Sequence, residues 1–224
     1  MRCVRLRFSK SGDMIYISHL DINRMMTRAV RRAHLPMWYT EGFNPHPYIS
    51  FALPLPLGQS SECEFMDIRI EGDMTNDEVL KKLRAVMPQG VEIVSAEEAV
   101  HSANEINKAQ YSVTLGFSSE GQAERFCDET QKLLGGEELI AQKTGKKGHR
   151  KVLKEVNLIE QIFDWSVTSD GICAKLSLTL AAGNTVNLNP ALLVGTLEKQ
   201  MGIECARQFI ERRAILTANG EEFC

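Results

Sequence analysis

Residues 4–34, VRLRFSKSGDMIYISHLDINRMMTRAVRRAH, predict a strand followed by a helix. Apolar and polar side chains alternate over residues 4–9, which is the period-2 pattern of a half-buried strand. Ser18 fits the N-cap of a helix, and apolar residues then recur at helical spacing. Pro36 restricts the residue before it and ends the helical pattern. We therefore expect a helix over about 20–34.

The following segments continue the alternation of strands and helices. The patterns predict an extended connection at 49–57, a strand at 65–71, a helix at 77–87 and a strand at 91–95. Strand, helix, paired strands, helix and strand is the element order of a ferredoxin-like βαββαβ sandwich.

A second cycle follows the polar stretch 96–108. Its expected elements are a strand at 111–117, a helix at 119–134, a hairpin of 165–168 and 172–181, a helix through residue 201 and a strand at 205–210. Each cycle has the size of a small domain. We therefore expect an α+β protein of two tandem ferredoxin-like (βαββαβ) sandwiches, with domains at 1–97 and 108–216.

Composition excludes several protein classes and reveals a charge asymmetry. The chain has 224 residues, is 43% hydrophobic and has a net charge of -3, which excludes collagenous, disordered and strongly basic proteins. Residues 1–60 contain eight Lys and Arg against three acids, whereas residues 61–100 contain four against ten. A basic face is therefore expected near the N-terminus.

The six cysteines give no sign of a metal site. No two of them have the CxxC or CxxxCxxC spacing of a zinc or iron–sulfur site, so we expect no metal and no cofactor held by this chain. The first residues lack the apolar core of a signal peptide, and no apolar run reaches the ~18 residues of a membrane span. These patterns favour a cytoplasmic protein with reduced thiols and no membrane partner.

The strongest candidate for a site is the segment EGFNPHP at residues 41–47. It combines the titratable side chains Glu41 and His46 with Asn44 and Phe43 on a backbone stiffened by prolines, and stiffness reduces the entropy lost on binding. His19, at the start of the first expected helix, would join Glu41 and His46 if the segment folds over that helix end. The alternative is a rigid crossover in which Phe43 packs into the core.

The second candidate is a basic face on the first strand and helix. Arginine guanidinium groups bind phosphate oxygens in bidentate geometry, and aromatic rings stack on unpaired bases. The expected RNA- or phosphate-binding residues here are Arg5, Arg7, Arg24, Arg28, Arg31, Arg32 and Asn44, with Tyr39, Phe43 and Tyr48 as stacking residues. The alternative is a solvated helix side paired with nearby acids.

A third basic segment, KTGKKGHRK, lies at residues 143–151. Lys146, Lys147 and Arg150 are expected to contact phosphates from a flexible loop. The segment lacks the GxxxxGK[ST] order of a nucleotide-binding loop. A solvated hairpin tip is an equally good interpretation.

Several of these motifs together resemble a known family. The resemblance rests on FSK at 8–10, YISHLD at 16–21, EGFNPHP at 41–47, SFA at 50–52, and Leu55-x-Leu57-Gly58. They resemble the radical SAM-linked proteins of unknown function, which occur alone or fused behind a radical SAM domain. The resemblance implies that the partner is a radical SAM enzyme and that the role of the protein is related to RNA or ribosomes. It supplies no established reaction.

Two positions depart from that family's pattern. Tyr48 stands where a Lys is frequent and Asn189 where an Arg is frequent, which removes two cations. The chain also lacks the CxxxCxxC motif of radical SAM chemistry, so it would act as a partner and not as the cluster-bearing enzyme.

Three functions remain open at this stage. The first is a non-catalytic protein that binds or presents RNA for a radical SAM enzyme. The second is a metal-independent endoribonuclease, in which His19 or His46 is the general acid or base, Glu41 sets its pKa, and an arginine stabilises the phosphorane. The third is a protein-only docking subunit, in which the basic N-terminal half binds an acidic surface of the radical SAM enzyme or of another protein and the 41–47 segment is the anchor.

Overall fold

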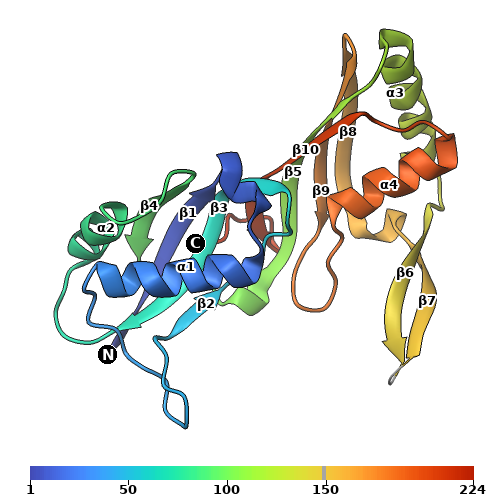
Figure 1. The fold of residues 1–224 in the computed structure, drawn as a ribbon. Coiled ribbons are helices and arrows are strands. Elements are labelled where there is room, and N and C mark those ends of the chain that lie inside the picture. The colour runs from blue at the N-terminus through green and yellow to red at the C-terminus, as the bar shows by residue number, and fades with distance from the viewer. Residues whose placement is uncertain (148–149) are drawn as a thin grey trace. The chain divides into compact units, whose positions relative to one another are not determined.

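The computed structural model describes residues 1–147 and 150–224, and the side chains of residues 1–142 and 154–224. The chain divides into two compact units. Unit 1 comprises residues 1–106 together with 211–224, and unit 2 comprises residues 107–210. Both contain strands and helices (Figure 1), so the expected α+β class is confirmed.

Unit 1 follows the order strand, helix, two strands, helix, strand. Its elements are β1 (Arg2–Lys10), α1 (His19–Arg32), β2 (Ile49–Phe51), β3 (Gln59–Ile70), α2 (Asn76–Arg84) and β4 (Val91–Glu97). The hydrogen-bonded strand order is β4-β1-β3, with β2 paired on β3, and each of these pairs is antiparallel. Strand β10 (Arg207–Thr217) continues this order beyond β3.

The core of unit 1 lies between the two helices and one face of the sheet. Val4, Leu6 and Phe8 of β1 are at most 2% exposed and belong to the same buried cluster as Ile22 and Met26 of α1. Alternate side chains of a strand point to opposite faces, so Arg5 and Arg7 project from the face opposite α1. The arginines of β1 and those of α1 therefore lie on different sides of the sheet.

Helix α1 spans His19–Arg32, against an expected 20–34, and begins after the predicted N-cap Ser18. The Ser18 hydroxyl accepts a hydrogen bond from the backbone N–H of Asp21 at 3.2 Å, which satisfies one free donor of the first turn. The Ser18 hydroxyl also donates to the Asp21 carboxylate at 2.7 Å and, as the largest cause, lowers the pKa of Asp21. The ionised carboxylate complements the positive end of the helix dipole.

Unit 2 repeats the alternation with an added hairpin. Its elements are β5 (Ile106–Gly116), α3 (Glu120–Leu134), β6 (Ile140–Lys147), β7 (Arg150–Asn157), β8 (Ile162–Asp170), β9 (Cys173–Ala181), α4 (Pro190–Met201) and the start of β10. The strand order is β10-β5-β9-β8, while β6 and β7 form a separate two-stranded sheet. The β8–β9 hairpin turns around Gly171, as expected.

Two features differ from the expected fold. Residues 49–51 of the expected extended connection pair with β3 as strand β2. The expected second domain, 108–216, extends past residue 210, whereas the structure places residues 211–224 in unit 1. The reason is packing: Arg212 forms an ion pair with Glu64, and the ring of Phe223 packs on that of Phe65 at 5.2 Å.

Candidate nucleic-acid interface

The arginines of α1 line one groove on the surface of unit 1. The groove has a volume of about 690 Å³, and its remaining walls come from Asp21, Met25 and Pro88. Residues three, four or seven positions apart lie on the same side of a helix. This spacing brings together the four arginines expected from the sequence: Arg24, Arg28, Arg31 and Arg32.

Most of the guanidinium groups remain available to a ligand. Arg24 lies 3.3 Å from Asp21, but both side chains are more than half exposed. Arg32 donates one hydrogen bond to the carbonyl of Val86 at 2.9 Å. Within the described residues, Arg28 and Arg31 have no acidic partner. The groove is therefore a cluster of cations with little internal neutralisation.

This arrangement has an energetic cost for the free protein. Like charges four residues apart, as in Arg24–Arg28 and Arg28–Arg32, each destabilise a helix by roughly 0.2–0.5 kcal/mol. The negative end of the helix dipole near Arg31 and Arg32 offsets part of this cost. A bound polyanion would neutralise the arginines and so remove the remaining repulsion between them.

Arg5 does not belong to this surface, which corrects the prediction made from the sequence. It is 3% exposed, and it binds the Asp67 carboxylate through Nε and Nη2 at 2.7 and 2.8 Å. Its Nη1 donates to the backbone carbonyls of His101 and Cys224 at 2.7 and 2.8 Å. The Arg5 guanidinium also lies 4.4 Å from the ring centroid of Phe223. Its donors are used inside unit 1.

Arg7 is half-buried on the same side of the sheet as Arg5. It lines a small cavity of about 70 Å³ together with Glu97, Glu98 and Glu222. A phosphate would meet three carboxylates at this position. Arg7 is therefore removed from the phosphate-binding set for the same reason of strand geometry, namely that it faces away from α1.

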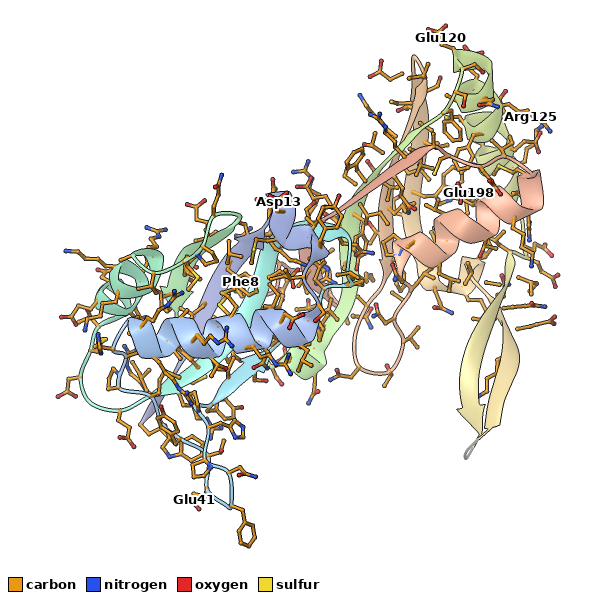
Figure 2. The ribbon with its side chains drawn as sticks, in the orientation of Figure 1. Phe8, Asp13, Glu41, Glu120, Arg125 and Glu198 are labelled. Atoms are coloured by element: carbon orange, nitrogen blue, oxygen red, sulfur yellow. The ribbon has the colours of Figure 1, made fainter. Side chains whose placement is uncertain are left out.

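Residues 40–47, named here the Phe43 loop, project from unit 1 between α1 and β2. Figure 2 shows Glu41 at the outer end of this loop. Phe43 is fully exposed, at 105% of its reference area, which rejects the alternative that it packs into the core. Asn44 and His46 are also exposed.

The stacking residues expected from the sequence have different environments. Tyr39 is 42% exposed and pairs with Pro47 across the base of the Phe43 loop. Tyr48 is half-buried, and its ring centroid lies 4.2 Å from the guanidinium of Arg69. The Tyr48 ring is thus already in contact with Arg69, whereas Phe43 and Tyr39 are exposed to solvent.

His19, His46 and Glu41 do not come together in this structure. His19 packs edge-on against Phe51 with ring centroids 4.9 Å apart, in a small pocket that also contains Lys10. His46 binds within the Phe43 loop, and its Nδ1 lies 3.0 Å from the carbonyl oxygen of Asn44. Helix α1 separates His19, at its first residue, from the segment that begins the loop. The expected convergence is therefore wrong.

The environment of His19 affects its protonation. Burial is the largest cause that lowers the pKa of His19, and Lys10 lowers it further, while Glu64 raises it. The imidazole is consequently neutral over a wider pH range than a free histidine.

Neither a metal-binding cluster nor a membrane-spanning helix occurs among the described residues. No group of three or more His, Cys, Asp and Glu side chains in the described part of the chain has the arrangement of a metal site. Among the helices of that part, none is long and apolar enough to cross a membrane.

A family model covers most of the chain. The family described as "Uncharacterized protein conserved in bacteria (DUF2344)" matches residues 3–190. The chain belongs to the DUF2344 family. No curated protein matches it. Nothing in these comparisons links the DUF2344 family to radical SAM enzymes, so that part of the resemblance stays a prediction.

Solved structures resemble the DUF2344 chain in fold. A chain of a Cbf5-Nop10-Gar1 complex aligns with a TM-score of 0.53 at 9% identity, covering 95% of this chain and 48% of that one. A chain of an H/ACA RNP bound to a substrate RNA aligns with a TM-score of 0.49 at 8% identity, over 93% and 46%. The DUF2344 chain thus spans about half the length of these chains. The likeness to the first concerns fold alone.

The third basic segment lies outside the described side chains of the DUF2344 protein. The backbone of residues 140–147 pairs with that of 150–157 as the hairpin β6–β7. Lys146, Lys147 and Arg150 belong to this hairpin, and the placement of their side chains is outside the described residues. Their phosphate-binding role stays a prediction.

A buried charged cluster was missed by sequence reasoning. Lys10 is 2% exposed, Glu64 is 4% exposed and Arg212 is 1% exposed. From the sequence alone, each of these charged residues would be expected on the surface. One signal was available for Lys10: it continues the inward alternation of Val4, Leu6 and Phe8. Burial lowers the pKa of Lys10. Glu64 and Arg212 lie far apart in sequence, so no local pattern could pair them.

Proposed function

We propose that this DUF2344 protein is a non-catalytic RNA-binding protein that holds the phosphate backbone in the arginine groove of α1. The observation that carries the proposal is the gathering of four arginines in one groove of about 690 Å³ with a single acid among its lining residues. Planar guanidinium groups bind phosphate oxygens in pairs, which favours a polyanion over an isolated carboxylate ligand.

The geometry favours binding over catalysis. The ribonuclease alternative requires an imidazole and its acidic partner beside the scissile phosphate. His19 packs against Phe51 in its own pocket, and His46 has loop partners on an exposed tip. Neither histidine lines the arginine groove. This arrangement therefore does not favour an endoribonuclease.

The partner follows from the resemblance and not from the geometry. The chain resembles proteins linked to radical SAM enzymes, so we infer that it presents bound RNA to such an enzyme. Co-purification of the two proteins after complete nuclease treatment, or in a ternary complex with RNA, tests this inference. If neither complex forms, the inferred partnership with a radical SAM enzyme is rejected, while the RNA-binding proposal is unaffected.

We also infer that each unit is a variant of the ferredoxin-like sandwich. In unit 1 the strand order β4-β1-β3-β2 is antiparallel at each pair. In unit 2 the order β10-β5-β9-β8 has the same sequence of elements, with β6–β7 inserted after α3. Both orders support a βαββαβ plan with helices on one face.

The RNA proposal is tested by binding of single-stranded RNA at low salt. The test variant is Arg24→Gln with Arg31→Gln, seven residues apart on α1. The control is Arg125→Gln with Lys132→Gln, seven residues apart on α3 and removing the same charge. The two pairs match closely, since Arg24 and Lys132 each have an acid three residues earlier, at 3.3 and 2.8 Å.

We expect the α1 variant to lose at least tenfold in affinity and the α3 variant to stay within twofold of the wild type. If the wild-type protein retains no RNA at low salt, or if both variants lose affinity equally, the groove is rejected as the binding site.

A further inference from the structure

The Phe43 loop exposes an aromatic side chain completely. Phe43 is 105% exposed, and no described residue of unit 1 covers it. Full burial of such a side chain is favourable, and a phenyl ring held in water at the tip of a projecting loop gains nothing for folding. An exposed residue on a loop with a defined shape points to recognition.

Hydrogen bonds within the loop give it that shape. The backbone N–H of Thr40 donates to the carbonyl of His46 at 2.9 Å, and the N–H of His46 donates to the hydroxyl of Thr40 at 3.3 Å. The Nδ1 of His46 lies 3.0 Å from the carbonyl oxygen of Asn44 and 3.1 Å from the hydroxyl of Thr40. Gly42 has a φ of +125°, a conformation that L side chains rarely adopt.

The base of the loop is braced against β3. The N–H of Trp38 donates to the carbonyl of Arg69 at 2.9 Å, and the N–H of Tyr48 donates to the carbonyl of Trp38 at 3.0 Å. The guanidinium of Arg69 lies 4.2 Å from the ring centroid of Tyr48 and 5.4 Å from that of Trp38. Such cation–π contacts hold the two stems together. The base of the loop is therefore fixed to unit 1.

The charge of the segment indicates which kind of molecule it meets. No Lys or Arg occurs between Ala33 and Ile68, and Glu41 adds a negative charge at the tip. A nucleic acid or an anionic membrane would find no cation on this loop. Rigid, uncharged aromatic residues are the usual anchors of protein–protein interfaces.

We propose that the Phe43 loop docks onto a protein partner by inserting Phe43 into an apolar pocket. The partner must offer a cavity that accepts one phenyl ring, with hydrogen-bond donors at its rim. The rim donors would meet the carboxylate of Glu41, which is exposed on the same loop two residues before Phe43. This docking site is independent of the arginine groove and of RNA.

The first test identifies what contacts the tip. A photoreactive benzoylphenylalanine replaces Phe43 in the full chain in its native cell, and the same group at Phe209, an exposed phenylalanine of unit 2, is the control. We expect a protease-sensitive, nuclease-resistant adduct from position 43 only. An adduct to RNA, to lipid or to a second copy of this chain would overturn the proposal, as would no adduct above that of the control.

The second test measures affinity with the purified partner protein so identified. We expect Phe43→Ala to weaken binding by 20-fold or more, as for a central anchor. Gly42→Ala retains the phenyl ring but cannot keep the φ of +125°, so we expect it to weaken binding by at least fivefold. Phe209→Ala should bind within twofold of the wild type.

An affinity unchanged by Phe43→Ala would overturn the proposal even if the adduct forms. RNA binding by the Phe43→Ala variant is measured in parallel and should equal that of the wild type. Failure of the RNA-binding proposal is thereby distinguished from failure of the docking proposal.

Discussion

At the scale of single residues, buried charges of unit 1 hold segments distant in sequence together. Arg212 Nη1 lies 2.8 Å from the Glu64 carboxylate and donates to the carbonyl of Leu53 at 2.9 Å. Both charged side chains are at most 5% exposed. Removing one partner of such a pair leaves the other charge buried and uncompensated.

Glu64→Ala is therefore expected to lower the free energy of unfolding by about 3–5 kcal/mol, measured by urea denaturation. A neighbouring pair of the same chemistry is the control: Arg213 and Glu62 lie 2.9 Å apart with both side chains about half exposed. Glu62→Ala should cost less than about 1 kcal/mol. Similar losses for the two variants would contradict the structural role given to Glu64.

His19 provides a prediction on pH. Its folded-state pKa is lowered below 6.5, chiefly by burial, so the unfolded chain binds the proton more tightly. Stability contributed by neutral His19 is present above pH 6.5 and is lost as the pH falls below that value. Denaturation at pH 7 and pH 5 should show a smaller decrease for His19→Phe than for the wild type. A larger decrease in the variant would reject the assignment.

At the scale of elements, α1 combines stabilising ends with a repulsive middle. Arg28 lies four residues from both Arg24 and Arg32, and arginine and glutamine have similar helix propensities. Arg28→Gln is therefore expected to raise the free energy of unfolding by a few tenths of a kcal/mol at low ionic strength, and by less in high salt. Thermal denaturation at two salt concentrations measures the effect.

Arg125→Gln on α3 is the control for that comparison. A salt-independent gain from Arg28→Gln, or an equal gain from both variants, would show that the α1 arginines do not repel one another.

The elements that sequence reasoning found share strong local signals. Helix α1 has a capping serine, a regular apolar period and a terminating proline, and all of these act within the segment itself. Strand β2 has only three residues, and its existence depends on pairing with β3, so it was predicted as a connection. The burial of Arg5 likewise depends on His101 and Cys224, about 100 residues or more away. Patterns of neighbouring residues hold no information on such contacts.

At the scale of the whole molecule, residues 211–224 complete a unit that begins at residue 1. Phe223 is 2% exposed and packs edge-on against Phe65, with the Arg5 guanidinium 4.4 Å from its ring. Phe223→Ala would leave a cavity in this packing. We expect a loss of about 3–5 kcal/mol in the unfolding free energy of unit 1, measured by urea denaturation.

Phe163→Ala, at a phenylalanine that is 50% exposed in unit 2, serves as the control and should cost far less. If the two substitutions had equal effects, the last residues would not be an integral part of unit 1.

The most direct test of the central claim is the salt dependence of RNA binding. Each arginine that neutralises a phosphate of single-stranded RNA contributes about 0.7 to the slope of log affinity against log salt concentration. The slope of the Arg24→Gln, Arg31→Gln variant should therefore be shallower than that of the wild type by about 1.4, while the Arg125→Gln, Lys132→Gln variant keeps the wild-type slope. Equal slopes for all three proteins would contradict the claim that the α1 groove holds the RNA backbone.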